Sequence, residues 1–353
     1  MVRPAIAYID CRALAHNYLF LQKKSYPATV VAVVKANAYG HGLSIISQEL
    51  FKLGCRYFAV TDVSEAVILR QSLGFDVSII VLSGLFDPSE AELCCGYQLT
   101  PFISEESQLS WLAAYHFHAQ VWLKVNSGMN RLGCENLREL IYSCQKKGIV
   151  VESICSHLAC ADEPEHLLNH EQVRFMQDLK EIFSLPMSLL NSAGILSMPQ
   201  FSFEFVRPGL ALYGVNPFSS KSVLSLKPVM HLCARIMQIR DVAAGAYISY
   251  GGSFRATDRM RIALVSLGYA DGLVRSLSNC GYASFEGNSF PIVGRVCMDY
   301  CLLDVGDSQV NVGDELCFFG AYPTAFDVAA LAHTISYTLL TGVGSRVKRM
   351  VTP

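Results

Sequence analysis

Residues 30–42, VVAVVKANAYGHG, are the most informative stretch of the sequence, because they predict a buried strand that ends at a lysine. The stretch begins with β-branched and small apolar residues, which are typical of a strand buried on both faces. It then meets Lys35 and breaks into Ala-Asn-Ala-Tyr-Gly-His-Gly, where turn-forming residues end the strand. A lysine at this point is costly unless its charge is compensated or lost, and a desolvated, neutral amine can attack an aldehyde. The alternative is a lysine whose stem carries its charge to the surface.

The composition excludes several classes of protein. The 353 residues are enough for two domains, and the net charge of −2 without charge runs indicates neither a nucleic acid nor an anionic membrane as partner. A hydrophobic content of 52% predicts large buried surfaces and an extensive subunit interface. The 13 cysteines form no CxxC spacing and follow no secretory segment, which predicts reduced thiols in the cytoplasm. No apolar run approaches the ~20 residues that span a bilayer.

Short apolar runs alternate with helix-period segments over the first part of the chain. The expected strands are residues 29–34, 57–60, 77–82, 99–103, 119–125, 150–155, 187–190 and 203–206. The clearest expected helices are residues 43–53, 63–73, 105–115, 136–147 and 166–183, with a further helix starting at Pro88 behind Asp87. Eight such alternations predict an α/β fold with an N-terminal (β/α)8 barrel, and a doubly wound sheet is the alternative.

The two ends of the chain differ from this alternation. Residues 1–10 are expected to form a strand, with Asp10 capping a helix over 11–24. A segment rich in proline and serine follows Tyr213 and resembles a linker. Strands are then expected at 231–239, 261–265, 290–296, 300–305 and 315–319, with one helix from Asp327 to about Leu340. We therefore predict a barrel domain over 1–222 and a mostly antiparallel β domain over 223–353.

Active sites of barrels lie at the carboxyl ends of the strands, so the polar residues there form one set. That set is Lys35 after the first strand, Lys124 and Arg131 at the fifth, His157 and Asp162 at the sixth, Asn191 and Ser192 at the seventh, and Arg207 and Gly209 at the eighth. Ser192 and Gly209 follow the strands after which barrels commonly bind phosphate through backbone amides. A phosphorylated cofactor is therefore expected, although a single His or Arg at a strand end is commonly a capping or surface residue.

The chain resembles the alanine racemases over nearly its whole length. The motifs that carry the resemblance are VVAVVKANAYGHG, VRPGLALYG, ISYGGSF, GYADGLVR, GRVCMDY and ISYT. The resemblance implies that Lys35 carries pyridoxal 5′-phosphate and that Arg207 faces its pyridine nitrogen. It further implies a cofactor site of Tyr39, Arg131, His157, Asn191, Ser192, Gly209, Leu210 and Tyr337, in which Arg131 faces the phenolic oxygen and His157 links Arg207 to a second base. Lys124 matches a lysine that is often carbamylated in this family and orients Arg131.

The resemblance places a second group of site residues in the β domain. It implies that Tyr250 is the second base and acts in the partner subunit, so that a homodimer is the working unit. Met298 and Asp299, together with Arg131, would bind the substrate. Asp162, Tyr269, Arg275 and Arg295 would form the entrance. The expected reaction interconverts L- and D-alanine, with D-alanine destined for peptidoglycan.

Chemical reasoning supports these assignments. Racemisation removes a proton from one face of Cα and returns it to the other, and one side chain rarely serves both faces. Arginine only donates hydrogen bonds, so Arg207 would leave the pyridine nitrogen unprotonated and the electron sink weak. A weak sink suppresses transamination.

Three other functions are alternatives to this assignment, and one group of residues resembles a metal site. A broad-range or serine-preferring racemase is the neighbouring alternative. A barrel-type decarboxylase would be expected to offer a carboxylate to the pyridine nitrogen, and a non-catalytic carrier of the cofactor consists of the barrel alone. His157, Cys160, Asp162, Glu163, His166 and His170 cluster in sequence, but their spacing fits no closed zinc pattern, so no metal is expected.

Overall fold

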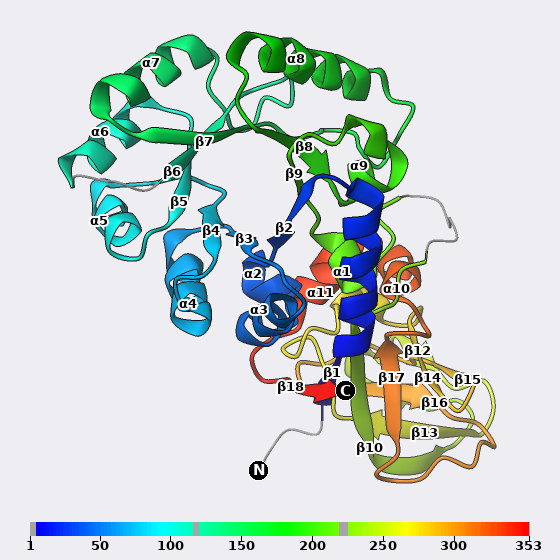
Figure 1. Cartoon of the computed structure of the whole chain (residues 1–353). Helices are drawn as coiled ribbons and strands as arrows, with labels where there is room; N and C mark the ends of the chain where they lie inside the picture. The colour runs from blue at the N-terminus through cyan, green and yellow to red at the C-terminus, as the bar shows by residue number, and fades with distance from the viewer. Residues whose placement is uncertain (1–4, 116–119, 219–224, 353) are drawn as a thin grey trace.

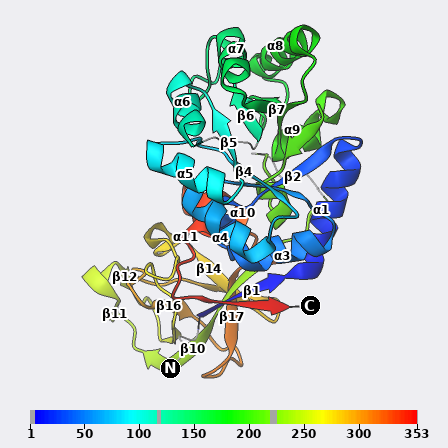
Figure 2. The same cartoon turned by 60° about the vertical axis from the view of Figure 1, so that its left-hand side comes forward.

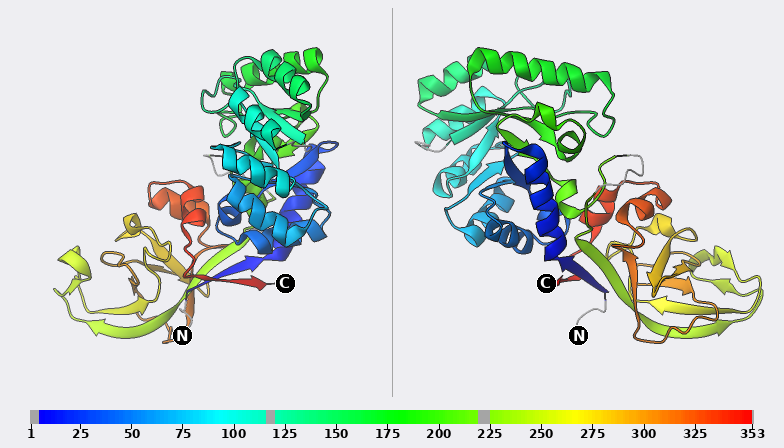
Figure 3. Two further views of the ribbon diagram at one scale, coloured as in Figure 1. Left: turned by 90° about the vertical axis from the view of Figure 1, so that its left-hand side faces the viewer. Right: turned by 45° about the vertical axis from the view of Figure 1, so that its right-hand side comes forward.

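The computed structural model describes residues 5–115, 120–218 and 225–352. Figure 1 shows a barrel surrounded by helices, with a separate sheet at one end of it. One hydrophobic core runs from Ala5 through the barrel to Val347, so the barrel and the sheet are packed together. The sheet lies below the barrel in the view turned by 60° and below it and to its left in the view turned by 90° (Figures 2 and 3).

Eight parallel strands close the barrel, which confirms the predicted fold class and excludes the doubly wound sheet. The strands are β2 (Thr29–Val33), β3 (Tyr57–Val60), β4 (Ser78–Val81), β5 (Thr100–Ile103), β6 (Gln120–Lys124), β7 (Val150–Cys155), β8 (Met187–Asn191) and β9 (Phe205–Arg207). The pairing of Thr29 in β2 with Phe205 in β9 closes the ring. Because all eight strands are parallel, their carboxyl ends meet at one rim.

Most helices of the barrel lie where the sequence pattern predicts them. The helices are α1 (Cys11–Ser25), α3 (Leu43–Lys52), α4 (Val63–Leu73), α5 (Pro88–Gly96), α6 (Glu106–Ala114), α7 (Leu137–Lys147), α8 (Leu167–Phe183) and α9 (Ser192–Ser197), with short helical turns at α2 (Lys35–Tyr39), η1 (Pro199–Phe201) and η2 (Leu210–Tyr213). Of these, α2 and α9 were not predicted. The expected caps are present, since Asp10 accepts from the Ala13 amide and Asp87 from the Ser89 amide. Local capping therefore fixes several of these starts.

The second sheet is mostly antiparallel, as predicted, and includes both ends of the described chain. Its elements are β1 (Ala5–Asp10), β10 (Met230–Val242), β13 (Met260–Val265), β14 (Tyr282–Phe285), β15 (Asn288–Pro291), β16 (Cys301–Asp304), β17 (Glu315–Phe319) and β18 (Lys348–Thr352), and the small pieces β11 (Tyr247–Ile248), η3 (Tyr250–Gly252), β12 (Phe254–Arg255) and η4 (Arg275–Leu277) lie near it. β1 lies between β10 and β18 and is parallel only to β18. The predicted domain boundary between residues 222 and 223 lies outside the described residues.

The prediction of one helix from Asp327 to about Leu340 is wrong. Two helices, α10 (Ala325–Leu331) and α11 (Ser336–Gly342), replace it. The chain turns between them because His333 adopts a left-handed conformation with φ of 52° and Ile335 is extended. No glycine or proline marks this break, so the sequence carried no signal for it. The strand expected over 290–296 also lies earlier, at β15.

The break has a consequence for the site, because it lets α11 pack against the turn α2. Tyr337 of α11 is thereby brought to Tyr39 of α2, with ring centroids 5.9 Å apart. Within the described part of the chain, no helix combines the length and the apolar composition needed to cross a membrane.

Candidate active site

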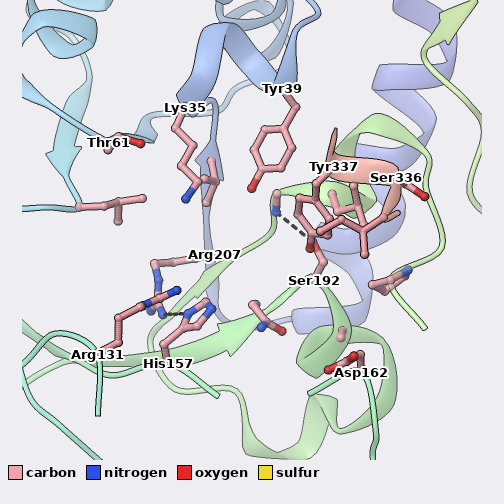
Figure 4. Close-up of a pocket in the computed structure, with 18 of the residues that line it drawn as sticks. Lys35, Tyr39, Thr61, Arg131, His157, Asp162, Ser192, Arg207, Ser336 and Tyr337 are labelled. Carbon is pink, nitrogen blue, oxygen red and sulfur yellow. Dashed lines mark hydrogen bonds between the residues drawn. The ribbon is translucent and has the colours of Figure 1, made fainter. Parts of the chain in front are cut away.

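A cavity of about 1000 Å³ opens at the carboxyl ends of the barrel strands (Figure 4). The predicted residues that line it are Lys35, Tyr39, Lys124, Arg131, His157, Asp162, Asn191, Ser192, Arg207, Gly209, Leu210 and Tyr337. The structure therefore brings together the residues expected at the strand ends, and it adds Tyr337 from the second part of the chain. In Figure 4, Lys35 and Tyr39 descend from the same turn into the cavity, opposite Arg131, Arg207 and His157.

The turn that carries Lys35 has an unusual backbone. Residues 36–39 all have φ between 51° and 55°, so α2 is a left-handed turn rather than an ordinary helix. Each non-glycine residue in this conformation costs roughly 1–2 kcal/mol, so other contacts must hold it. The carboxylate of Glu65 accepts from the Asn37 amide at 2.9 Å and from the Thr61 amide at 3.2 Å. This carboxylate fixes the outer side of the turn.

Gly40 ends the turn in close contact with α11. Its φ is 81°, and a Cβ there would lie 2.0 Å from the carbonyl oxygen of Leu340. Arg349 of β18 donates two hydrogen bonds to the Gly40 carbonyl, at 3.0 and 2.8 Å. The position of Lys35 therefore depends on residues that are more than 300 positions away in the sequence.

The cavity is rich in positive groups. Desolvation, followed by the charge of Arg131, lowers the pKa of Lys35. Desolvation, together with the smaller effects of the Arg207 and Arg131 charges, lowers the pKa of the buried Lys124 to about 8, while the nearby Cys155 opposes the shift. Among the described residues, no carboxylate forms an ion pair with Lys35, Lys124, Arg131 or Arg207. An anionic ligand would therefore be attracted to this end of the cavity.

Arg207 is buried, and its guanidinium is held entirely by neutral acceptors. It donates to the Ser188 hydroxyl, to the Ser156 carbonyl at 2.5 Å, and to His157 Nδ1 at 3.3 Å. Because arginine has no acceptor, His157 Nδ1 is the accepting atom and the ring proton lies on Nε2. Desolvation and the nearby Arg207 charge hold the pKa of His157 well below its usual value, so the ring is neutral.

The other end of the cavity is lined by hydroxyl and backbone amide groups. The Ser192 hydroxyl accepts from the amides of Gly209 at 2.9 Å and Ala211 at 3.1 Å. A Cβ on Gly209 would lie 2.3 Å from the Tyr39 hydroxyl, so only glycine allows the phenol to approach this loop. Burial raises the pKa of both Tyr39 and Tyr337, which keeps their hydroxyl groups protonated as donors. This end can offer several hydrogen-bond donors to an anion such as phosphate.

Apart from Tyr337, the residues predicted in the β domain do not line the cavity. They are Tyr250, Tyr269, Arg275, Arg295, Met298 and Asp299. Tyr250 is 72% exposed and Met298 is 52% exposed. We call these six residues the C-terminal face. Within this chain, therefore, the structure does not bring Tyr250 to Lys35.

Backbone and side-chain contacts gather the C-terminal face, apart from Arg275, into one region. The Arg295 guanidinium lies against Gly251, next to Tyr250, and the Tyr269 amide donates to the Cys297 carbonyl beside Met298. Arg346 donates to Asp299 at 2.6 Å, which fixes that carboxylate. The region is thus built around Tyr250 and the 295–299 loop.

Sequence reasoning missed three residues that shape the site: Glu65, His41 and Arg349. Glu65 follows the cap Asp62 by three positions, a spacing typical of a helix start that could have drawn attention to it. His41 lies inside the opening motif, but nothing in the pattern separates it from a turn residue. Arg349 carries no local signal, because its partners are distant in sequence. In the described residues, no group of three His, Cys, Asp or Glu side chains could hold a metal ion.

Comparison with known proteins agrees with this geometry. Residues 9–217 match the family described as "Alanine racemase, N-terminal domain", and residues 229–351 match "Alanine racemase, C-terminal domain". A protein of Agrobacterium fabrum named "Alanine racemase, catabolic" is 38% identical over 97% of this chain and 90% of its own length. The biosynthetic alanine racemase structure from Pseudomonas aeruginosa superposes with a TM-score of 0.93 at 34% identity, covering 100% of both chains.

A third relative bears on the cofactor. The alanine racemase structure from Bartonella henselae, described with covalently bound pyridoxal phosphate, superposes with a TM-score of 0.92 at 33% identity over 99% of each chain. The predicted resemblance is confirmed by matches that cover both parts of the chain. This chain belongs to the alanine racemase family.

Proposed function

We propose that the protein interconverts L- and D-alanine with pyridoxal 5′-phosphate as cofactor, and that the D-alanine serves peptidoglycan synthesis in the cytoplasm. One observation carries the proposal. Lys35 projects, with a lowered pKa, into a cavity that is cationic at one end and rich in hydroxyl and amide groups at the other. Membership of the family supports alanine as the substrate.

The described residues fit such a cofactor. Arg131 and Arg207 would donate to the phenolate oxygen and the pyridine nitrogen of the cofactor, and they lack carboxylate partners among the described residues. Tyr39, Tyr337 and the 209–210 backbone would hold the phosphate, with Ser192 and Asn191 beside them. When bound, pyridoxal phosphate withdraws electrons from the amino acid, so that the proton on its Cα becomes acidic enough to remove.

Two side chains from different copies would then move the proton. A lowered pKa increases the neutral fraction of Lys35, which allows this amine to accept a proton at one face of Cα. Tyr250 of a second copy would donate to and accept from the opposite face. The exposure of Tyr250 and the absence of its side chain from the cavity of its own chain support a homodimer with shared sites.

Lys124 would be carbamylated in the active protein. Its pKa of about 8 leaves part of the amine neutral near physiological pH, and a neutral amine can add carbon dioxide. The carbamate would be an anion between Arg131 and Arg207, where the described residues supply no carboxylate ion pair. It would orient Arg131 by a charge-assisted hydrogen bond.

The surroundings of Arg207 favour racemisation over decarboxylation. A barrel-type decarboxylase would place a carboxylate at the pyridine nitrogen, whereas Arg207 is surrounded by Ser188, Ser156 and His157. With only a donor at this point, a bound pyridine nitrogen would remain unprotonated and the electron sink would be weak. A broader or serine-preferring racemase has no specific observation in its favour.

The test is a racemisation assay over a panel of L-amino acids with the purified protein and added pyridoxal phosphate. D-amino acids are detected by coupling to an amino-acid oxidase that is specific for the D form. We expect D-alanine to form fastest, and carbon dioxide release to stay at background. Faster turnover of serine, or stoichiometric release of carbon dioxide, would contradict the proposal.

A further inference from the structure

His41 is buried immediately behind the left-handed turn, and the proposed mechanism does not use it. It has 0% exposure. Its Nδ1 lies 3.0 Å from the carbonyl oxygen of Ala38 and 2.9 Å from that of Tyr39. Since carbonyl oxygens only accept, Nδ1 carries the ring proton and donates to both. These two carbonyls belong to the residues in the turn that have positive φ.

Aromatic contacts fix the plane of the His41 ring. The ring packs on Tyr213 with centroids 4.5 Å apart, and Tyr213 in turn packs on Tyr39 at 4.8 Å. The Tyr213 hydroxyl donates to the carbonyl of Val33, the last residue of the strand that leads to Lys35. These contacts therefore fix the position of the His41 donor relative to both the strand and the turn.

We propose that His41 is a positioning residue, whose Nδ1–H holds the left-handed turn and thereby sets how firmly the chain retains a phosphorylated aldehyde cofactor. The proposal rests on the proposed function only for the identity of that cofactor. The turn orients Lys35 at its first residue and Tyr39 at its last. Without the donor, the strained residues 36–39 would relax and these two side chains would separate.

The second ring nitrogen of His41, Nε2, supports a role in orientation rather than in proton transfer. His41 Nε2 is buried and has no hydrogen-bond partner among the described residues. Burial lowers the pKa of the ring to about 4, so it remains neutral at physiological pH. The ring therefore contributes a fixed donor and no charge.

The test compares two nearly isosteric variants in the full-length protein. His41→Asn places an amide NH2 near the position of Nδ1, whereas His41→Leu has the same branching and no donor. The first measurement is the rate of pyridoxal phosphate loss during dialysis. The second is hydrogen exchange by mass spectrometry over residues 34–43, without added cofactor, where the amides of Ala38, Gly40 and Gly42 bond to the carbonyls of Val34, Ala36 and Asn37.

We expect His41→Leu to lose the cofactor roughly tenfold faster, as the loss of one hydrogen bond shared between two carbonyls would produce, while His41→Asn stays within about threefold of the wild type. Exchange over 34–43 should accelerate only in the leucine variant. If His41→Leu does not fold, His41→Gln, whose amide is displaced from the Nδ1 position, replaces it. Wild-type behaviour of the donor-free variant, or equal damage in the asparagine variant, would overturn the proposal. A wild type that binds no pyridoxal phosphate would refute the proposed function, and the exchange result would still decide the role of His41.

Discussion

The cavity in the barrel and the C-terminal face differ in how far their residues are exposed to solvent. Arg207 and Lys124 are 5% and 6% exposed in the cavity, whereas Tyr250 and Met298 on the face are 72% and 52% exposed. The cavity residues are placed by backbone and side-chain contacts from several elements of the same chain. The face is organised by the 295–299 loop but encloses nothing. The contrast supports the proposal that one chain carries two parts of a site that meet between copies.

The most damaging change on the cavity side is Lys35→Ala. Removing the amine removes both the covalent anchor of the cofactor and one base, so racemisation should fall by roughly a thousandfold or more. Borohydride reduction followed by peptide mapping measures the anchor, with Lys124 as the internal control. Trapping of the cofactor on Lys124 in the variant would show that Lys35 is not the anchor.

On the C-terminal face, Tyr250→Phe should lower kcat without weakening the binding of the cofactor. The variant keeps the ring and lacks the proton, so we expect a loss of roughly 10²–10⁴ in kcat. Because Tyr250 does not line the cavity of its own chain, retention of pyridoxal phosphate during dialysis should be unchanged. A variant that loses cofactor as fast as Lys35→Ala would remove the distinction between the two regions.

Lowering the pH should reduce the stability of the folded chain, because two histidines on the cavity side are buried. Burial lowers the pKa of His41 to about 4, against 6.5 for an exposed ring, and His157 is shifted in the same direction. Between these values the unfolded chain binds a proton that the folded chain does not, so the stability present above pH 6.5 is lost as the pH falls towards 4. For His41 the loss is about 3 kcal/mol.

Urea unfolding at several pH values between 7 and 4 measures this loss. We expect His41→Asn to show a shallower decline than the wild type, since the variant lacks one of the two rings. An unchanged decline would mean that His41 is not the source of the pH dependence.

The smallest effect concerns Lys124. Lys124→Ala should lose roughly ten- to a hundredfold in activity, the range typical of residues that orient a ligand-binding group. If the role of Lys124 is to supply an anion as a carbamate, short carboxylic acids should restore part of the activity of the alanine variant. Rescue by short amines but not by acids would identify a role for the cationic lysine instead.

Local patterns predicted the elements that local forces determine. The helix α4 (Val63–Leu73) and the strand β17 (Glu315–Phe319) were predicted with their observed bounds, because apolar periodicity and turn residues lie within the same segment. The expectation that barrel active sites lie at the carboxyl ends of the strands also grouped Lys35, Lys124 and Arg207 correctly from the sequence. In these cases burial imposes a pattern on neighbouring residues.

Features that depend on distant contacts could not be predicted. The break before α11 has no glycine or proline, and the left-handed turn at residues 36–39 contains no glycine, so local propensity argued against both. The turn is stabilised by Glu65, His41 and Arg349, and the last of these lies at the far end of the chain. The residues of the C-terminal face came from a family resemblance, since exposed polar residues follow no periodicity.

The most direct test of a site shared between copies is complementation of two inactive variants. Lys35→Ala and Tyr250→Phe chains are each expected to be inactive, and they are mixed under conditions in which subunit exchange is verified by differently tagged chains. A mixed dimer contains one site with both Lys35 and Tyr250, so activity should return to about half of the wild-type value per mixed dimer. Mixed dimers that remain as inactive as the parent variants would contradict a site built from two chains.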